Sequence, residues 1–276
     1  MRTLGAEGFL GRAKPPAGSR VNFSHYLGRS VGACFLFNEG SGKRIYDAAY
    51  GYHYAITGTP KFTSLQNEPG LYLTQSDTQY VDIGNPTHIN FSSADSYSVE
   101  LILVSATTAS SAMCPISKDT VTGNQRFNFY SDGSNLYRWT ELAGPALGSS
   151  KARHHLLYTY DGRGTNTGLE TWYENGRSYS SRSGAMPSPQ LSANWNLGRN
   201  IFSGSNFFLF NGLLSLARIY RRALSAADAV RLWHNPYEMM VRPGKEFPRL
   251  TPVIYADSWQ PLQSLPVPAK INVVSY

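Results

Sequence analysis

The stretch "FNGLLSLARIYRRALSAADAVRLWHNPY", from Phe210 to Tyr237, decides the fold of this chain. Its first half is rich in residues that favour β-strands, and its second half carries the signals of a helix. Ser225 is a good N-cap, and Asp228 stands three residues later, as in a capping box. Asn235-Pro236 ends the helix, because the residue before a proline disfavours helical backbone. The pattern predicts a strand that leads into one short helix.

The residues before this stretch look like short strands separated by turns. Turn signals recur about every ten residues, a spacing typical of β-sandwiches. Asn175-Gly176 supplies the positive φ angles of a type I′ turn and predicts a hairpin, and Asn211-Gly212 predicts a second one. The run "YSVELILVSA", from Tyr97 to Ala106, has few polar interruptions and predicts a central strand covered on both faces. The chain is therefore expected to be all-β, with one helix near its end.

Composition narrows the functional classes. Aromatic residues make up 13% of the 276 residues and charged residues only 16%, which suits strands and turns. The net charge is +7, but the Lys and Arg residues are scattered and no nucleic-acid-binding motif accompanies them, so we expect no nucleic-acid partner. No apolar run is long enough to span a membrane. Cys34 and Cys114 are interpreted as buried thiols, with one disulfide left open as the alternative.

Several segments, taken in order, resemble the laminin G-like branch of the concanavalin A-like jelly rolls. The resemblance spans residues 28–237 and rests on "FNEGSGKRIYDAA", "DTQYVDIGN", "SVELILV", "HHLLYTYDG", "WYENGR" and the closing strand and helix. It implies a two-sheet antiparallel jelly-roll sandwich with one short C-terminal helix and extended terminal arms. The sequence departs from the family pattern where Ile102 replaces a tryptophan and where the loop after Asp47 lacks the usual Ser and Asn.

A second resemblance concerns the segments that flank this domain. "KPPAGSRVNFSHYLGRSVGACFLFNEG" and "HNPYEMMVRP" look like the corresponding parts of laminin G-like proteins encoded in tailed-phage genomes. This resemblance implies a virion surface or capsid decoration protein, with a capsid or other virion protein as its partner. The N-terminus has no apolar run of signal-peptide length, so we expect synthesis in the host cytoplasm and a place on the virion surface.

The expected organisation is an N-terminal arm (1–27), the jelly-roll domain (28–237) and a Pro-rich extended C-terminal arm (238–276). The C-terminal arm combines prolines, which oppose a helix, with large apolar side chains, which favour burial. We expect it to dock onto another subunit or scaffold in a homo-oligomer such as a trimer; the alternative is that it packs back on its own domain. The candidate assembly residues are Phe247, Ile254, Tyr255, Trp259 and Leu262.

Catalytic motifs are scarce, and we expect no enzyme. Glycoside hydrolysis needs two carboxyls about 5–9.5 Å apart, and no Asp or Glu is followed two residues later by another. Glu170 and Glu174 come closest, at about 13 Å along a strand. A pair from different strands remains open. His154 and His155 are neighbours in an expected strand, so their side chains point to opposite faces and do not chelate one metal.

The loop after the first strand holds the candidate binding residues. Tyr50, Tyr52 and His53 crowd an exposed loop, where aromatic faces and polar groups favour a glycan site, although packing roles are the alternative. Trp139 and Trp172 are interpreted as packing residues. Asp47 is the best candidate for a calcium ligand, with a loop-fixing Asx-turn as the alternative. No cofactor is required by this reading, and calcium is the one that the residues suggest.

The sequence thus predicts a non-enzymatic structural or binding subunit, and the resemblance implies a phage virion protein that displays a laminin G-like sandwich and docks through its terminal arms. The alternative is a carbohydrate-binding lectin or adhesin for host attachment, with a cell-surface glycan as its partner.

Overall fold

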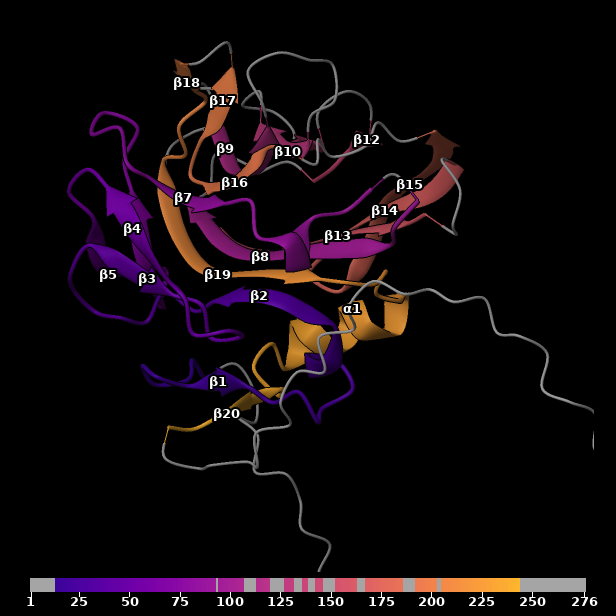
Figure 1. Ribbon diagram of the computed structural model, residues 1–276, viewed down its shortest axis with the longest axis horizontal. Helices are drawn as coiled ribbons and strands as arrows, with labels where there is room; N and C mark the ends of the chain where they lie inside the picture. Colours follow the sequence, from indigo (N-terminus) through magenta and orange to yellow (C-terminus); the bar gives the residue numbers. More distant parts are fainter. Residues whose placement is uncertain are drawn as a thin grey trace, which may run out of the picture. The chain divides into compact units, whose positions relative to one another are not determined.

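The computed structural model of the chain describes residues 13–92, 94–106, 113–119, 127–131, 136–138, 142–145, 152–162, 167–185, 192–202 and 205–243. Within these ranges two eight-stranded antiparallel sheets face each other (Figure 1). The first sheet has the order β12 (Leu142–Ala143), β11 (Leu136–Arg138), β10 (Phe127–Ser131), β9 (Met113–Asp119), β16 (Asn194–Leu197), β7 (Tyr80–Gly84), β4 (His53–Thr57), β3 (Arg44–Tyr46). The second has β15 (Arg177–Ala185), β14 (Thr167–Glu174), β13 (Arg153–Asp161), β8 (Tyr97–Ser105), β19 (Gly212–Tyr220), β6 (Glu68–Leu73) and β5 (Lys61–Leu65), with β2 (Val31–Phe35) also paired to β19. The expected all-β sandwich is confirmed.

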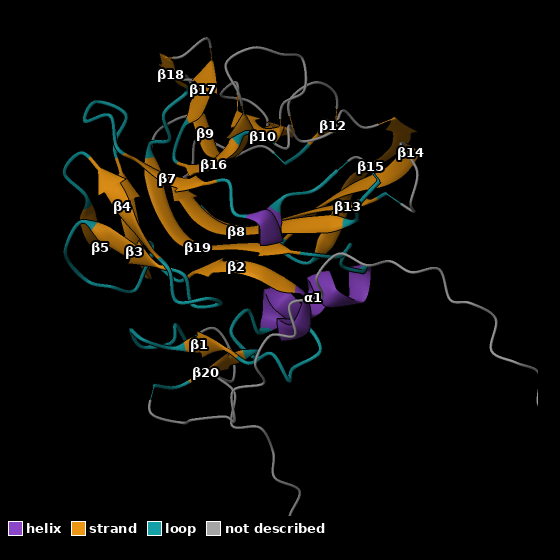
Figure 2. Ribbon diagram, in the orientation of Figure 1, coloured by secondary structure: helices purple, strands orange, loops and turns teal. Residues whose placement is uncertain are grey.

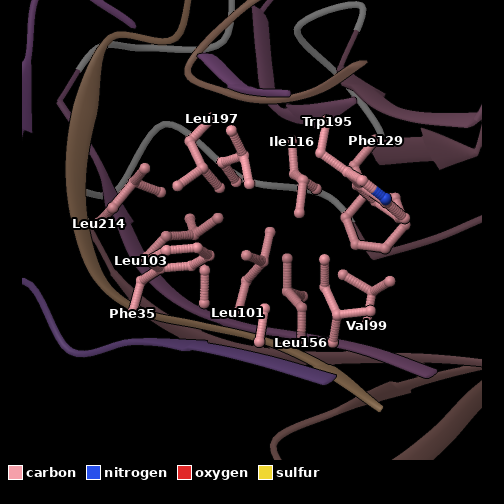
Figure 3. Close-up of a cluster of buried hydrophobic side chains, with 14 of the residues drawn as sticks. Phe35, Val99, Leu101, Leu103, Ile116, Phe129, Leu156, Trp195, Leu197 and Leu214 are labelled. Carbon is pink, nitrogen blue, oxygen red and sulfur yellow. The ribbon is translucent and has the colours of Figure 1, made fainter. Parts of the chain in front are cut away.

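The main core lies between the two sheets (Figure 3). Strand β8 shows how the sequence builds it, because successive side chains of a strand point to opposite faces. Val99, Leu101 and Leu103 point into the sandwich, where Ile116 and Trp195 of the facing sheet meet them. All nine residues of β8 are buried, so the predicted central strand with both faces covered is confirmed.

The outer face of the second sheet carries a second apolar cluster under α1 (Ala226–His234) (Figure 2). Ser225 accepts a hydrogen bond from the Asp228 backbone N–H, and the Asp228 side chain accepts one from the Ser225 backbone N–H, so the predicted capping box is present. Leu232 is buried in this cluster together with Ile102 of β8. The helix therefore seals the face of the sheet that would otherwise expose apolar side chains.

A buried ionic network crosses the same face. Glu100 accepts hydrogen bonds from Arg218 at 3.0 Å and from the Tyr220 hydroxyl at 2.6 Å, and its carboxylate lies 2.8 Å from a ring nitrogen of His155. Burial alone would raise the pKa of Glu100, but the Arg218 guanidinium and the other partners lower it. Arg218 also donates to the Pro236 carbonyl at 2.5 Å, which ties the end of the helix to the sheet.

One of the two predicted hairpins is confirmed and the other is wrong. Asn175 (φ 50°) and Gly176 (φ 79°) join β14 to β15 with the positive angles of a type I′ turn. Asn211-Gly212 has no positive φ, and the strand before it, β18 (Ser205–Phe207), pairs with β17 (Asn200–Phe202) rather than with β19. Gly212 serves a different purpose, since a Cβ there would collide with the backbone carbonyl of Val104 on the neighbouring strand.

Residues from the expected N-terminal arm pack on the domain. β1 (Arg20–Val21) pairs with β20 (Met240–Val241), and short 3₁₀ turns follow at Gly28–Ser30 (η1) and Thr87–Ile89 (η2). The Lys14 ammonium donates to the carbonyls of Phe37 and Pro69. The compact unit extends to Pro243, and the expected domain bounds of 28 and 237 stay a prediction.

Two further expectations concern cysteines and the membrane. Cys34 and Cys114 are both buried and no disulfide joins them, which settles the open alternative in favour of thiols. Among the described residues, no helix has the length and apolar character needed to cross a membrane.

Candidate functional site

The loop between β3 and β4 is held in shape by Asp47. Its side-chain Oδ1 accepts hydrogen bonds from the backbone N–H groups of Cys34 at 3.0 Å and Ala49 at 2.9 Å. Its backbone N–H donates to the Tyr52 carbonyl at 2.8 Å, and Gly51 closes the turn with a φ of 82°. Asp47 is fully buried, and burial raises its pKa to about 6 although the backbone donors oppose that rise. The geometry is that of a loop-fixing Asx-turn.

This turn presents Tyr50 and Tyr52 beside His88 from η2. The ring centroids of Tyr50 and His88 are 4.4 Å apart. Those of Tyr52 and His88 are 6.3 Å apart with the rings only 20° from parallel. Phe23 adds a fourth ring, 5.9 Å from Tyr50. We call these four residues the aromatic platform. Tyr52 is 54% exposed, so its ring is available to a ligand.

Arg221 and a small polar pocket adjoin the platform. The pocket has a volume of about 140 Å³ and is lined by Thr87, His88, Asn90, Phe91, Asp95, Ser96 and Arg221. Burial lowers the pKa of His88, and the neighbouring Arg221 lowers it further, so the imidazole is neutral at pH 7. Among the described residues the His88 Nε2 has no hydrogen-bond partner. The pocket thus combines a cation, a carboxylate and a neutral imidazole next to an exposed ring.

His53 points elsewhere, so the structure divides the three predicted glycan residues. His53 lies 5.1 Å from Tyr46, measured between ring centroids, and lines a larger cleft with a volume of about 550 Å³. Tyr50 and Tyr52 belong to the platform, and His53 belongs to this cleft. Sequence reasoning missed Phe23, His88 and Arg221, because each reaches the platform from a distant segment. The only signal was the basic cluster "RIYRR", which contains Arg221.

The remaining candidates are placed as follows. Trp172 is fully buried in the main core, which supports its interpretation as a packing residue. His154 contacts Glu174 on the inner face of its sheet and His155 contacts Glu100 on the outer face, so they point apart as predicted. Trp139 and the arm residues Phe247, Ile254, Tyr255, Trp259 and Leu262 lie outside the described residues.

Metal ligation has little support from the side chains. The described part of the chain contains no group of three or more His, Cys, Asp or Glu residues that could hold a metal ion. One carboxylate oxygen of Asp47 already accepts hydrogen bonds from two backbone N–H groups. The role of Asp47 as a calcium ligand stays a prediction.

Comparison with known families places this fold. The model of the Laminin_G_3 family, described as "Concanavalin A-like lectin/glucanases superfamily", matches residues 75–229, more than half of the chain. The chain belongs to this family. The match covers β7, β8, the β13–β15 strands, β19 and the first residues of α1, which include most of the segments that carry the sequence resemblance; "FNEGSGKRIYDAA" lies before it. No curated protein sequence gives a significant match.

Solved structures share the fold at low sequence identity. The binding domain of Paraclostridial Mosquitocidal Protein 1 is 14% identical, with a TM-score of 0.53 over 74% of this chain and 52% of that one. The binding domain of botulinum neurotoxin DC in complex with rat synaptotagmin II is 13% identical, with a TM-score of 0.52 over 75% and 52%. The chain thus spans about half the length of these toxin domains. Domain 4 of a Geobacillus stearothermophilus arabinanase, in complex with arabinotriose, gives a TM-score of 0.47 at 16% identity over 78% and 99%.

Proposed function

We propose that this chain is a non-enzymatic carbohydrate-binding domain whose site is the aromatic platform with its adjoining polar pocket. The observation that carries the proposal is the Tyr52 ring, exposed over half its surface and backed by His88 beside a polar pocket. The family name includes lectins, and two solved structures with this fold are described as binding domains, which supports a binding role.

The chemistry suits a sugar. A pyranose ring has an apolar face of C–H groups that packs on an aromatic ring, and hydroxyls that need both donors and acceptors. Tyr52 supplies the ring. Arg221 donates hydrogen bonds, the Asp95 carboxylate accepts them, and the neutral His88 does one or the other according to its tautomer. The pocket is large enough for part of one sugar unit, so the rest of the ligand would lie along the platform.

The test is a glycan array followed by titration of any ligand found. Tyr52→Ala should weaken binding about tenfold, because an aromatic contact is worth about 1–1.5 kcal/mol. Tyr179→Ala is the matched control, since Tyr179 is 50% exposed but lies on β15, drawn on the side of Figure 1 opposite β4. Equal affinities for the two variants, or no ligand on a broad array, would refute the proposal.

Under this proposal the domain binds a sugar without hydrolysing it, and binding requires no metal ion. Glu174 contacts His154 at 2.8 Å and Glu170 pairs with Arg182 at 3.4 Å, so both carboxylates have basic partners. A bound oligosaccharide incubated with the protein should be recovered intact by mass spectrometry. Its affinity should be the same in EDTA as in calcium; a loss in EDTA would assign calcium a role.

We propose further that the domain is displayed on a virion and anchored by its terminal segments, in a homo-oligomer such as a trimer. The antiparallel pairing of Arg20 with Val241 supports this, because it brings the segments before β1 and after β20 to the same end of one ladder. Quantitative mass spectrometry of particles from the source would test it: hundreds of copies indicate a capsid surface, a handful a tail position, and none overturns the proposal.

A further inference from the structure

The cleft that contains His53 is a second candidate site, separate from the platform. Its volume of about 550 Å³ falls in the range of small-molecule sites. It is lined by residues of the loop before β3 and by residues of β3 and β4. The register pairs Tyr46 with His53 and Arg44 with Ala55, and all four line the cleft. Ile45 and Ile56 also line the cleft and belong to the main core, so they form its apolar floor, whereas Tyr54 packs against the core and does not line the cleft.

The cleft carries two cations that are neighbours in the chain. Lys43 and Arg44 are exposed, and neither forms an ion pair with any residue that the structure describes. Other cationic side chains do have such partners; Arg153, Arg182, Arg199 and Arg218 are examples. Two adjacent exposed cations at the rim of a cleft favour a ligand with an anionic group.

Glu39 gives the cleft an acceptor beside these cations. One of its carboxylate oxygens accepts the Tyr46 backbone N–H at 2.8 Å. The other is buried and has no hydrogen-bond partner in the described part of the chain. Glu39 also lines the cleft, so a rotation of its side chain would let this oxygen accept a ligand hydroxyl, which would remove the cost of leaving it unpaired. The same carboxylate repels a polyanion such as nucleic acid, so the matching ligand has one anionic group together with hydroxyl donors.

We propose that this cleft binds an acidic saccharide. Its carboxylate or sulfate lies against Lys43 and Arg44, one of its hydroxyls donates to Glu39, and its ring rests beside Tyr46 and His53. The proposal stands independently of the platform, because the two sites share no lining residue. Loss of one function leaves the other measurable.

The experiment titrates the full chain by calorimetry with four probes: sialyllactose, a glucuronic acid disaccharide, a sulfated disaccharide and neutral lactose. At least one acidic probe should bind, and raising the salt concentration should weaken it, because screening reduces charge attraction. Lys43→Gln and Arg44→Gln should each reduce affinity about tenfold, as expected for loss of a charge-assisted hydrogen bond. Comparison of the affinities for the two carboxylate probes with the affinity for the sulfated probe shows which anionic group the cleft prefers.

Controls keep the outcomes distinct. Lys61→Gln removes an equally exposed cation from β5 and should change nothing. Tyr52→Ala should leave acidic-sugar binding intact. The proposal is overturned if no acidic probe binds, if lactose binds as well as the acidic probes, or if Tyr52→Ala abolishes binding while Lys43→Gln and Arg44→Gln do not.

Discussion

At the scale of single residues, Asp47 shows how one buried carboxylate can shape a binding loop. Burial raises its pKa from 3.8 to about 6, so between these values the folded protein holds a proton that the unfolded chain has released. Stability contributed by this group therefore falls as pH rises from about 4 to about 6. Asp47→Asn keeps an oxygen for the two backbone donors and removes the titration. Its stability relative to wild type should rise over that pH window.

Urea denaturation at pH 4, 5, 6 and 7 measures this difference. Asp77→Asn, at an exposed loop position, is the control and should show no such trend. A difference between wild type and Asp47→Asn that stays constant with pH would contradict the burial argument. The same variant tests calcium: if Asp47 were a ligand, calcium would raise the melting temperature of wild type and not of the variant.

Arg218 is the residue on which the outer face of the second sheet depends. Arg218→Met leaves the Glu100 carboxylate buried without its main cation, and breaking a buried pair this way costs about 3–5 kcal/mol. Adding Glu100→Gln should restore part of the loss, since it removes the uncompensated charge. Chemical denaturation of the two single variants and the double variant gives the coupling energy. Additive effects would show that the two groups act independently.

At the scale of elements, the β14–β15 hairpin is fitted to the helix through Gly176. A Cβ at Gly176 would lie 2.9 Å from the Trp233 Cβ and would require a φ of 79°. Gly40 has a similar φ of 75°, but a Cβ there would meet no atom within 4 Å. In both alanine variants the positive φ destabilises the folded state by about 1 kcal/mol, because alanine has a Cβ. Only Gly176→Ala adds a steric clash. Gly176→Ala should therefore unfold at clearly lower urea concentration; equal midpoints would mean that the hairpin and α1 are not in contact.

Elements with strong local signals were predictable, and elements set by distant contacts were not. The capping box at Ser225 and the turn at Asn175 depend on residues within a few positions, so the sequence reveals them. Asn211-Gly212 carries the same dipeptide signal, yet its glycine is needed for close approach to β8. Tyr52 could be proposed for the site from the sequence, because its own loop suggests exposure. His88 could not be proposed, because nothing near it in the sequence points to the site. Its place beside Tyr52 follows only from how η2 packs on the β3–β4 loop.

At the scale of the whole molecule, the fold depends on residues beyond the jelly roll that the sequence outlined. Met239 and Met240 are fully buried in the cluster under α1, and β20 pairs with β1. A chain that ends at Tyr237 loses both side chains from the core, and each buried methionine is worth about 1.5–3 kcal/mol. We therefore expect severe destabilisation of that variant. A chain that ends at Pro243 keeps the entire compact unit and should melt near the full-length temperature.

Thermal melts of three chains, the full-length one and those that end at Pro243 and Tyr237, decide where the domain ends. The chain that ends at Pro243 can then be tested for assembly on particles. A chain ending at Pro243 that is folded but no longer joins particles would assign anchoring to residues 244–276. If it still joined them, the anchor would lie in the compact unit or in the residues before it. If instead the chain ending at Tyr237 melted like full length, Met239 and Met240 would contribute nothing to the core, and the pairing of β1 with β20 would be dispensable to the fold.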